Sequence, residues 1–422
     1  MNLQVNKFNL INFLTKKLFP FYKSAEIKKF FEIISKNETN KSKDFAMFVG
    51  GCVRNFLKDE TIKDIDIATI FPPEIIKEKF KNTKFKIIET GLEHGTLTVV
   101  GEDFNYELTT LRKDITTDGR HAEVEFSADW TKDSERRDFT INAIYLNKNG
   151  KIFDPQSGLV DLENNIVKFI GDPEKRIQED YLRIIRFIRF FIFYNHSPEK
   201  TTIDALKVNL NGIKNLSRER IFDEFNKILE TKNFLNINKS KEIKDLFAVI
   251  FPECKYLSRI KYVKEINSEI ILNSTLLISL MVLDKSSNYE YFCHKYKSSN
   301  NLKEKLSNFQ KTYLASRKDN NFFTNDLQKN LYFFGKEAMI SAYLINKIDN
   351  KKIKDLDISV YKILKTSIPK FPIKGDYLLK QGFKEGPELG EVLKTLENIW
   401  IDNNFDISDK DVRNLIKNLK SN

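Results

Sequence analysis

FVGGCVR at residues 48–54, followed by DID at residues 64–66, is the stretch of sequence that decides the fold. A short apolar run ends in two glycines, and a helical pattern begins directly after them. Glycines let a phosphate group approach backbone N–H groups closely, and a helix N-terminus adds partial positive charge. We therefore expect Gly50, Gly51 and Arg54 to contact phosphate oxygens, with the arginine as the charged donor.

Asp64 and Asp66 stand two residues apart on a predicted strand. Alternation along a strand places both carboxylates on one face and the flanking isoleucines on the other. Adjacent carboxylates repel each other and favour a divalent cation, and oxygen ligands of this kind suit Mg²⁺. An isolated Asp-x-Asp is more often a solvated strand edge, but the preceding glycines and arginine favour a metal site here.

Strand and helix patterns alternate from the first motif to about Gly171. The expected strands are rich in Val, Ile and Thr, and one expected helix begins with a proline, as helices often do. The expected elements are strands at Phe45–Val49, Ile65–Ile70, Phe85–Glu89, Gly95–Val100 and Tyr106–Thr110, and helices at Cys52–Leu57 and Pro73–Phe80. The polar segment Asp114–Phe126 is expected to be a loop. This mixture predicts an α+β first part.

The pattern becomes helical after Gly171 and stays so to the C-terminus. Asp172 and Pro173 form a good N-cap and first helical position, and one long helix is expected from there to about Phe193. The chain of 422 residues is longer than a single core usually organises, so two or more domains are expected.

A second charged motif, DSERRDFTINA at residues 133–143, runs directly into an apolar segment. Charges this close to a core need partners. Two readings remain open: a structural ion pair, or an arginine that meets a triphosphate or ribose. In the second reading Asp138 holds that arginine.

Asp180, Arg183, Arg186 and Arg189 recur every three residues on the expected long helix, and apolar residues fill the other positions. A helix that is apolar nearly all round is buried, so these arginines need anionic or polar partners. They either form a structural network or line a nucleotide pocket.

Composition adds supporting arguments. The net charge of +11 and pI near 9.1 favour a polyanionic partner, although diffuse Lys and Asn enrichment explains the charge equally well. Cys52, Cys254 and Cys293 are odd in number and far apart, which fits a reducing cytosol. The N-terminus does not resemble a signal peptide, and the apolar run Ile270–Leu283 is too short to span a membrane. We therefore expect a cytoplasmic location and no membrane partner.

Together these motifs resemble the class II tRNA nucleotidyltransferases, or CCA-adding enzymes, and the related bacterial poly(A) polymerases. The resemblance is close over residues 45–230, weaker over 240–370, and returns in part over 371–390. It rests on six ordered motifs: Gly50-Gly51-x-x-Arg54, Asp64-x-Asp66, Arg136-Arg137-Asp138-Phe139-Thr140-x-Asn142-Ala143, Asp154-Pro155-x-x-Gly158-x-x-Asp161-Leu162, Glu179-Asp180-x-x-Arg183-x-x-Arg186 and Ser217-x-Glu219-Arg220-Ile221.

The resemblance implies a polymerase β-like catalytic head over residues 1–170, a base-recognising helical neck over 171–240, and an RNA-binding body and tail over 241–422. Asp64 and Asp66 would hold Mg²⁺ and catalyse the reaction, which adds CCA to tRNA from CTP and ATP. Gly50, Gly51 and Arg54 would hold the triphosphate, with Arg137 nearby. No protein partner is implied.

In the neck, Asp180 and Arg183 would read the base edge, and Arg186 and Arg189 would support the pocket or contact phosphate. The chain departs from the family at Asn55, where an aspartate is usual. Glu107 is a candidate third carboxylate.

Alternatives remain open at this point. One group comprises a poly(A) polymerase and enzymes that add CC or A alone. The others are a non-catalytic RNA-binding protein, against which the intact aspartate pair argues, and a nucleotidyltransferase that modifies something other than RNA.

Overall fold

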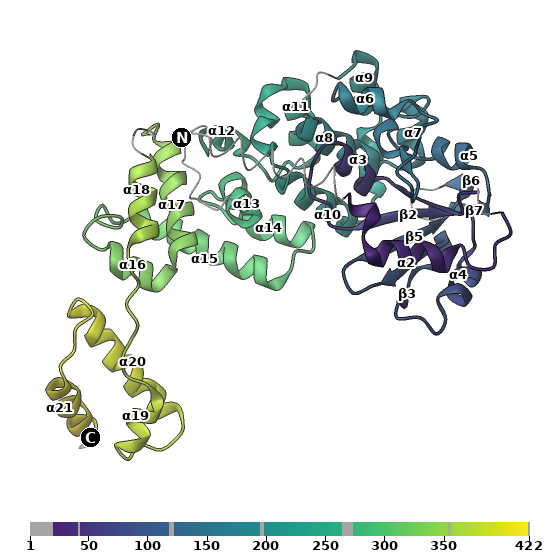
Figure 1. Ribbon diagram of the computed structural model, residues 1–422. Coiled ribbons are helices and arrows are strands. Elements are labelled where there is room, and N and C mark those ends of the chain that lie inside the picture. The colour runs from purple at the N-terminus through teal and green to yellow at the C-terminus, as the bar shows by residue number, and fades with distance from the viewer. Residues whose placement is uncertain are drawn as a thin grey trace, which may run out of the picture. The chain divides into compact units, whose positions relative to one another are not determined.

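The computed structural model describes residues 20–40, 43–117, 122–194, 198–263, 273–352, 354 and 356–420. The chain divides into two compact units, one ending at Ile250 and the other beginning at Phe251. All strands of the described residues lie in the first unit, and the described part of the second is helical (Figure 1). No helix among these residues is both long enough and apolar enough to cross a bilayer.

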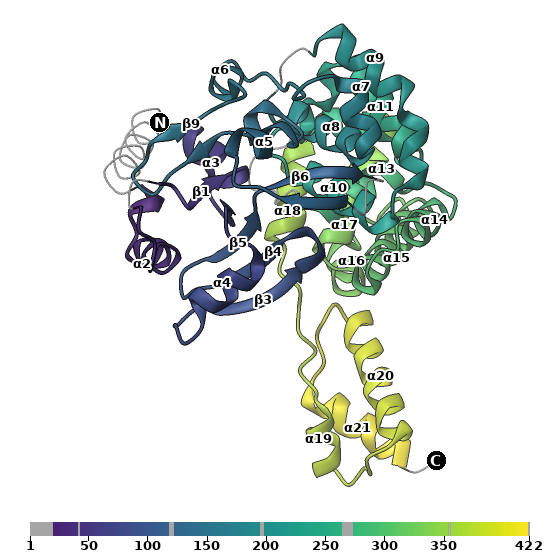
Figure 2. The same cartoon turned by 90° about the vertical axis from the view of Figure 1, so that its right-hand side faces the viewer.

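The first unit is built on a mixed seven-stranded sheet in the order β3-β4-β5-β2-β1-β8-β9, with a separate two-stranded sheet of β6 and β7. Figure 2 shows the larger sheet from β3 near its bottom to β9 near its top. The β2–β5 pair is parallel, and the other pairs are antiparallel. The strands are β1 (Ala46–Val49), β2 (Ile65–Thr69), β3 (Lys86–Gly91), β4 (Thr96–Val100), β5 (Asn105–Thr110), β6 (Arg112–Thr117), β7 (Ala122–Phe126), β8 (Tyr145–Leu146) and β9 (Ile152–Phe153).

Helices of the first unit pack on this sheet and continue beyond it. Phe30 of α2 stacks on Tyr106 of β5 with ring centroids 4.3 Å apart, which anchors the first helix to the sheet. The helices are α2 (Ala25–Ile34), α3 (Gly51–Leu57), α4 (Pro73–Phe80), α5 (Trp130–Glu135), α6 (Gly158–Glu163), α7 (Pro173–Glu179), α8 (Leu182–Tyr194), α9 (Lys200–Val208), α10 (Arg218–Leu229) and α11 (Lys241–Ile250).

The second unit is a helical array that ends in a small apolar cluster of its own. Leu378, Val392, Leu396 and Ile416 form part of this cluster, which joins the last three helices. The helices are α12 (Ile260–Val263), α13 (Ser274–Val282), α14 (Asn288–Lys295), α15 (Asn300–Ser316), α16 (Leu327–Phe334), α17 (Lys336–Asp349), α18 (Leu356–Lys365), α19 (Gly375–Lys380), α20 (Pro387–Asp402) and α21 (Asp409–Lys420).

The α+β fold class is confirmed, and each of the five expected strands is found within one or two residues at its ends. The loop prediction for Asp114–Phe126 is wrong, because most of this segment belongs to the hairpin β6–β7; residues 118–121 lie outside the described part. The prediction rested on polar composition, whereas antiparallel pairing is a property of the backbone.

The single long helix expected up to Phe193 is also wrong: α7 and α8 are separate helices. The chain leaves α7 at Asp180, whose φ of −154° and ψ of 104° are extended values. The Asp180 carboxylate then accepts a hydrogen bond from the backbone N–H of Leu182 at 3.1 Å. Asp180 is therefore a junction residue between the helices, and the three arginines that follow it lie on α8.

Candidate active site

The glycine pair brings the start of α3 against Asp66. Gly50 has a φ of +70°, which L side chains rarely adopt, and a Cβ there would stand 3.2 Å from Asp66 Oδ2. The backbone N–H of Gly51 donates a hydrogen bond to the same oxygen at 3.2 Å. The glycines thus permit the β1–α3 turn to close on the carboxylate of β2.

Three carboxylates lie together at this edge of the sheet, and we call Asp64, Asp66 and Glu107 the carboxylate edge. Asp64 immediately precedes β2, while Asp66 pairs directly with Glu107 of β5 in the parallel register. Burial raises the pKa of Asp66, and the charge of Asp64 adds to this effect against the opposing Gly51 N–H and arginine charges. Loss of solvent raises the pKa of Glu107 too, reinforced by the charges of Asp66 and Asp64.

The carboxylate edge fits a hard divalent cation. Its donors are carboxylate oxygens that repel one another, and a cation would offset this repulsion. Within the described residues, no group of three His, Cys, Asp or Glu side chains is already gathered closely enough to enclose a metal ion. A cation with few protein ligands, completed by water and substrate phosphates, matches this arrangement.

Arg136 and Arg137 are both held by Asp133, so the reading in which Asp138 holds an arginine of this motif is wrong. Arg137 Nη2 lies 3.0 Å from Asp133 Oδ2, and Arg136 Nη2 lies 2.7 Å from Asp133 Oδ1. Tyr145 donates its hydroxyl to the same carboxylate at 2.7 Å. Although burial alone would raise the pKa of Asp133, the two arginine charges lower it to about 2. Asp133 is the partner because it lies on α5 one helical turn before the two arginines, within reach of both.

Asp138 instead connects the glycine motif to α8. Its Oδ2 lies 3.0 Å from Arg186 Nη2, and its Oδ1 accepts a hydrogen bond from Asn142 Nδ2 at 2.9 Å. Asn142 in turn accepts a hydrogen bond from Arg54. The Arg54 guanidinium also lies over the ring of Phe190, 4.8 Å from its centroid. A continuous polar chain therefore runs from the first turn of α3 to the middle of α8.

Asp180 and Arg183 have separate partners at the start of α8. Asp180 Oδ2 lies 2.8 Å from Arg220 Nη2 on α10. Arg183 Nη1 lies 2.6 Å from Glu179 Oε2 and donates to the carbonyl oxygen of Arg176 at 2.7 Å. Both side chains keep spare hydrogen-bonding capacity, because a carboxylate has about four acceptor positions and a guanidinium five donors.

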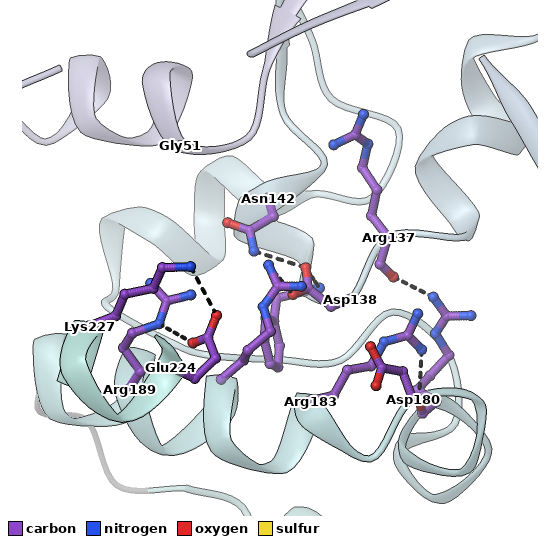
Figure 3. A network of polar contacts seen from close by, with 12 residues as sticks. Gly51, Arg137, Asp138, Asn142, Asp180, Arg183, Arg189, Glu224 and Lys227 are labelled. Carbon is purple, nitrogen blue, oxygen red and sulfur yellow. Dashed lines mark hydrogen bonds and ion pairs between the residues drawn. The ribbon is translucent and has the colours of Figure 1, made fainter. Parts of the chain in front are cut away.

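The far end of α8 is held by α10. Arg189 Nε donates to Glu224 Oε2 at 2.8 Å, and Lys227 Nζ lies 3.6 Å from the other oxygen of this carboxylate. Figure 3 shows the resulting network, which runs along α8 from Asp180 to Arg189 and faces the loop of Asp138 and Asn142. Arg54, Arg189 and Lys227 also line an open pocket of about 370 Å³.

The structure brings every site residue predicted from the sequence into this one unit, in two groups joined by Asp138. Sequence reasoning missed Asp133, Arg176, Arg220 and Glu224 as holding residues. Glu224 was detectable, because it falls with Ile221, Phe225 and Ile228 on the buried stripe of an amphipathic helix. Arg176, which donates to the backbone oxygens of Arg136 and Arg137, gives no comparable signal.

Family models place these parts in known domains. Residues 46–168 match the poly A polymerase head domain, residues 197–257 match "Probable RNA and SrmB- binding site of polymerase A", and residues 267–411 match tRNA nucleotidyltransferase domain 2. A crystal structure of the Bacillus stearothermophilus CCA-adding enzyme in complex with CTP aligns with a TM-score of 0.67 at 22% identity, covering 94% of this chain and 98% of that one. A sheet-based head that carries paired carboxylates, followed by helices, is the fold of a nucleotidyltransferase.

Curated relatives give the family. The human "CCA tRNA nucleotidyltransferase 1, mitochondrial" is 33% identical over 378 residues, which cover 87% of this chain and 85% of that protein. The CCA-adding enzyme of Streptococcus agalactiae is 30% identical over 390 residues, covering 89% and 93%. The chain belongs to the CCA tRNA nucleotidyltransferases, the CCA-adding enzymes.

Proposed function

We propose that this chain adds C, C and A to the 3′ end of tRNA, taking CTP and ATP as substrates and releasing pyrophosphate. One observation carries the proposal: the first unit holds both the carboxylate edge, which makes no ion pair among the described residues, and the chain of polar contacts from Arg54 to α8. The names of the relatives support it, since they describe CCA addition to tRNA.

In this proposal Asp64 and Asp66 hold Mg²⁺, with Glu107 as the neighbour that increases the negative charge. When bound there, the cation supplies activation of the RNA 3′-hydroxyl and neutralises charge on the leaving pyrophosphate. The Gly50–Gly51 turn and Arg54 bind the triphosphate, and Arg137 contributes a second guanidinium whose orientation Asp133 fixes. Nucleotidyltransfer in general requires a divalent metal, and the choice of Mg²⁺ rests on the oxygen-only donor set.

Asp180 and Arg183 select the base. A carboxylate accepts a hydrogen bond from the exocyclic amino group of C or A, and a guanidinium donates to the adjacent ring acceptor. UTP presents an oxygen where the amino group is needed, and both UTP and GTP present an N–H where the acceptor is needed. Each buried mismatch costs about 1–3 kcal/mol, which suffices to reject both nucleotides.

Arg186 and Arg189 support this pocket through Asp138 and Glu224. The second unit is proposed to dock the tRNA, and docking through phosphate contacts makes the affinity fall steeply with added salt. A cytoplasmic location remains a prediction, because similar proteins include ones named as mitochondrial; fluorescence localisation of the tagged chain would decide it.

A poly(A) polymerase is the second candidate, because the head matches the poly A polymerase head domain. Both candidates share the reaction and differ in what they add. The experiment is nucleotide addition to a tRNA transcript that lacks its 3′ CCA, with products resolved to single nucleotides. Two additions with CTP alone, and a stop after one final A with both nucleotides, are expected. A long ladder with ATP alone would instead identify a poly(A) polymerase.

A further inference from the structure

Two carboxylates of the proposed metal site are held in different ways. Asp66 lies within β2, which pairs with β1 and β5, and its side chain accepts the N–H of Gly51. Asp64 lies just before β2 and is exposed, and its carboxylate makes no hydrogen bond or ion pair with the residues that the structure describes. The position of Asp64 therefore depends on the loop of residues 58–64 that joins α3 to β2.

Asn55, in the last turn of α3, holds this loop in two places. Its side-chain Nδ2 donates a hydrogen bond to the carbonyl oxygen of Thr61 at 3.0 Å. Its backbone oxygen accepts the N–H of Glu60 at 2.8 Å. Thr61 is three residues before Asp64. The Asn55 side chain therefore fixes the backbone shortly before that aspartate.

The other ties of the loop lie further from Asp64 along the chain. Lys58 Nζ donates to Asn165 Oδ1 at 2.8 Å near the end of α6, and Glu60 pairs with Lys232 beyond α10 at 2.5 Å. These contacts fix the start and middle of the loop. Of these hydrogen bonds and ion pairs, the one between Asn55 and Thr61 lies nearest to Asp64 along the chain.

We propose that Asn55 is a positioning residue that sets Asp64 for cation binding, and that this chain needs an amide rather than a carboxylate at that position. The proposal rests on the proposed function, because it takes Asp64 as a cation ligand. A carbonyl oxygen accepts hydrogen bonds only, and an ionised aspartate at position 55 has no proton to donate. An ionised aspartate there would lose the bond to the Thr61 carbonyl, and the two oxygens would repel each other if the side chain kept its place.

The test compares Asn55→Ala and Asn55→Asp with a matched control, Asn164→Ala. Asn164, the exposed C-cap of α6, also donates its amide to a backbone carbonyl of the preceding helical turn, that of Val160 at 2.8 Å, and this bond does not involve the loop of residues 58–64. The readout is Mn²⁺ binding to the full chain, followed by electron paramagnetic resonance in the presence of a non-reactive CTP analogue. Thermal unfolding without metal and the KM for CTP are measured alongside.

Asn55→Ala is expected to raise the Kd for Mn²⁺ by about three- to tenfold, the effect of one lost hydrogen bond, and Asn55→Asp by at least as much. Asn164→Ala should bind Mn²⁺ as the wild type does. The KM for CTP should change less than the Mn²⁺ affinity in all three variants. Equal Mn²⁺ affinity in Asn55→Ala and Asn164→Ala, or tighter binding in Asn55→Asp, would overturn the proposal.

Asp64→Ala, measured in parallel, separates this inference from the proposed function. If Asp64→Ala binds Mn²⁺ as tightly as the wild type, the cation site itself is wrongly assigned. If Asp64→Ala binds weakly while Asn55→Ala does not differ from its control, the cation site stands and only the role of Asn55 fails.

Discussion

The carboxylate edge of the head and the arginines of α8 carry opposite charges and are balanced in opposite ways. Among the described residues, Asp64, Asp66 and Glu107 make no ion pair, and burial, reinforced by neighbouring negative charges, raises the pKa values of the last two. The arginines of α8 are each paired: Arg183 with Glu179, Arg186 with Asp138 and Arg189 with Glu224. The carboxylates of the head have arginine charges nearby but no direct ion pair among the described residues, whereas each of these α8 arginines has one.

This difference indicates how each region acts. Carboxylates without a direct ion pair would gain stability from a bound cation, as the proposed function requires of the head. A network that is already paired is held in position before any ligand arrives, which suits the recognition of a base edge. Removing a head carboxylate should therefore impair the reaction more than the fold, and removing a network partner should impair the fold as well.

The largest expected effect comes from the head. Asp66→Ala should lower the rate of nucleotide addition by about 1,000-fold or more, since metal assistance is worth several kcal/mol. The melting temperature should change little, because the variant also relieves repulsion within the carboxylate edge. Single-turnover addition and calorimetry measure the two effects, with the exposed Asp103→Ala as the control. Near-full activity of Asp66→Ala would refute the metal assignment.

Asp133→Asn should have the next largest effect, on stability. Asp133 is fully buried between Arg136 and Arg137, so losing its charge should cost about 3–5 kcal/mol of unfolding free energy. Denaturant unfolding at neutral pH measures this change. A loss below about 1 kcal/mol would show that the cluster contributes little to the fold.

The same residue predicts a pH dependence. Its folded pKa of about 2 lies below the ordinary aspartate value of 3.8, so its contribution is complete above about pH 4 and is lost as the pH falls towards 2. The loss amounts to about 2 kcal/mol in the wild type. Asp133→Asn should lack this component, which a comparison of unfolding at pH 4 and below would reveal.

A smaller loss of unfolding free energy is expected for two residues of α10, the buried Glu224 and the more exposed Lys227. Glu224 is 4% exposed and is the partner of Arg189, so Glu224→Gln should cost about 2–3 kcal/mol. Lys227 is half exposed, pairs with the exposed Asp223 at 2.6 Å and lies 3.6 Å from Glu224, so Lys227→Ala should cost less than about 1 kcal/mol. Equal losses in the two variants would contradict the distinction between a buried and a solvated pair.

Sequence patterns were sufficient where the interacting residues are close along the chain or follow a strand period. The order of strand, glycine pair and helix at residues 46–57 and the strand that carries Asp66 followed from such patterns and are confirmed. The common face of Asp64 and Asp66 stays a prediction. The register that places Glu107 beside Asp66 could only be suggested, because strand pairing is set by the whole sheet.

The neck shows where such reasoning fails. The break between α7 and α8 occurs at Asp180, which accepts the backbone N–H of Leu182 and also pairs with Arg220, forty residues later. The continuous helical pattern on both sides concealed this local capping contact. Assigning an arginine of the 133–143 motif to Asp138 failed for a different reason: the neighbour in sequence was chosen over Asp133, one helical turn away. A long-range partner contributes to the first detail, and helix geometry decides the second.

The central claim is that the head performs the reaction while Asp180 and Arg183 choose the base. The most direct measurement is the ratio of kcat/KM for CTP to that for UTP in the wild type, Asp180→Ala and Arg220→Ala. The account predicts that Asp180→Ala lowers this ratio by about 10- to 100-fold, with a smaller loss in Arg220→Ala, since Arg220 acts by holding Asp180. An unchanged ratio in Asp180→Ala would contradict it.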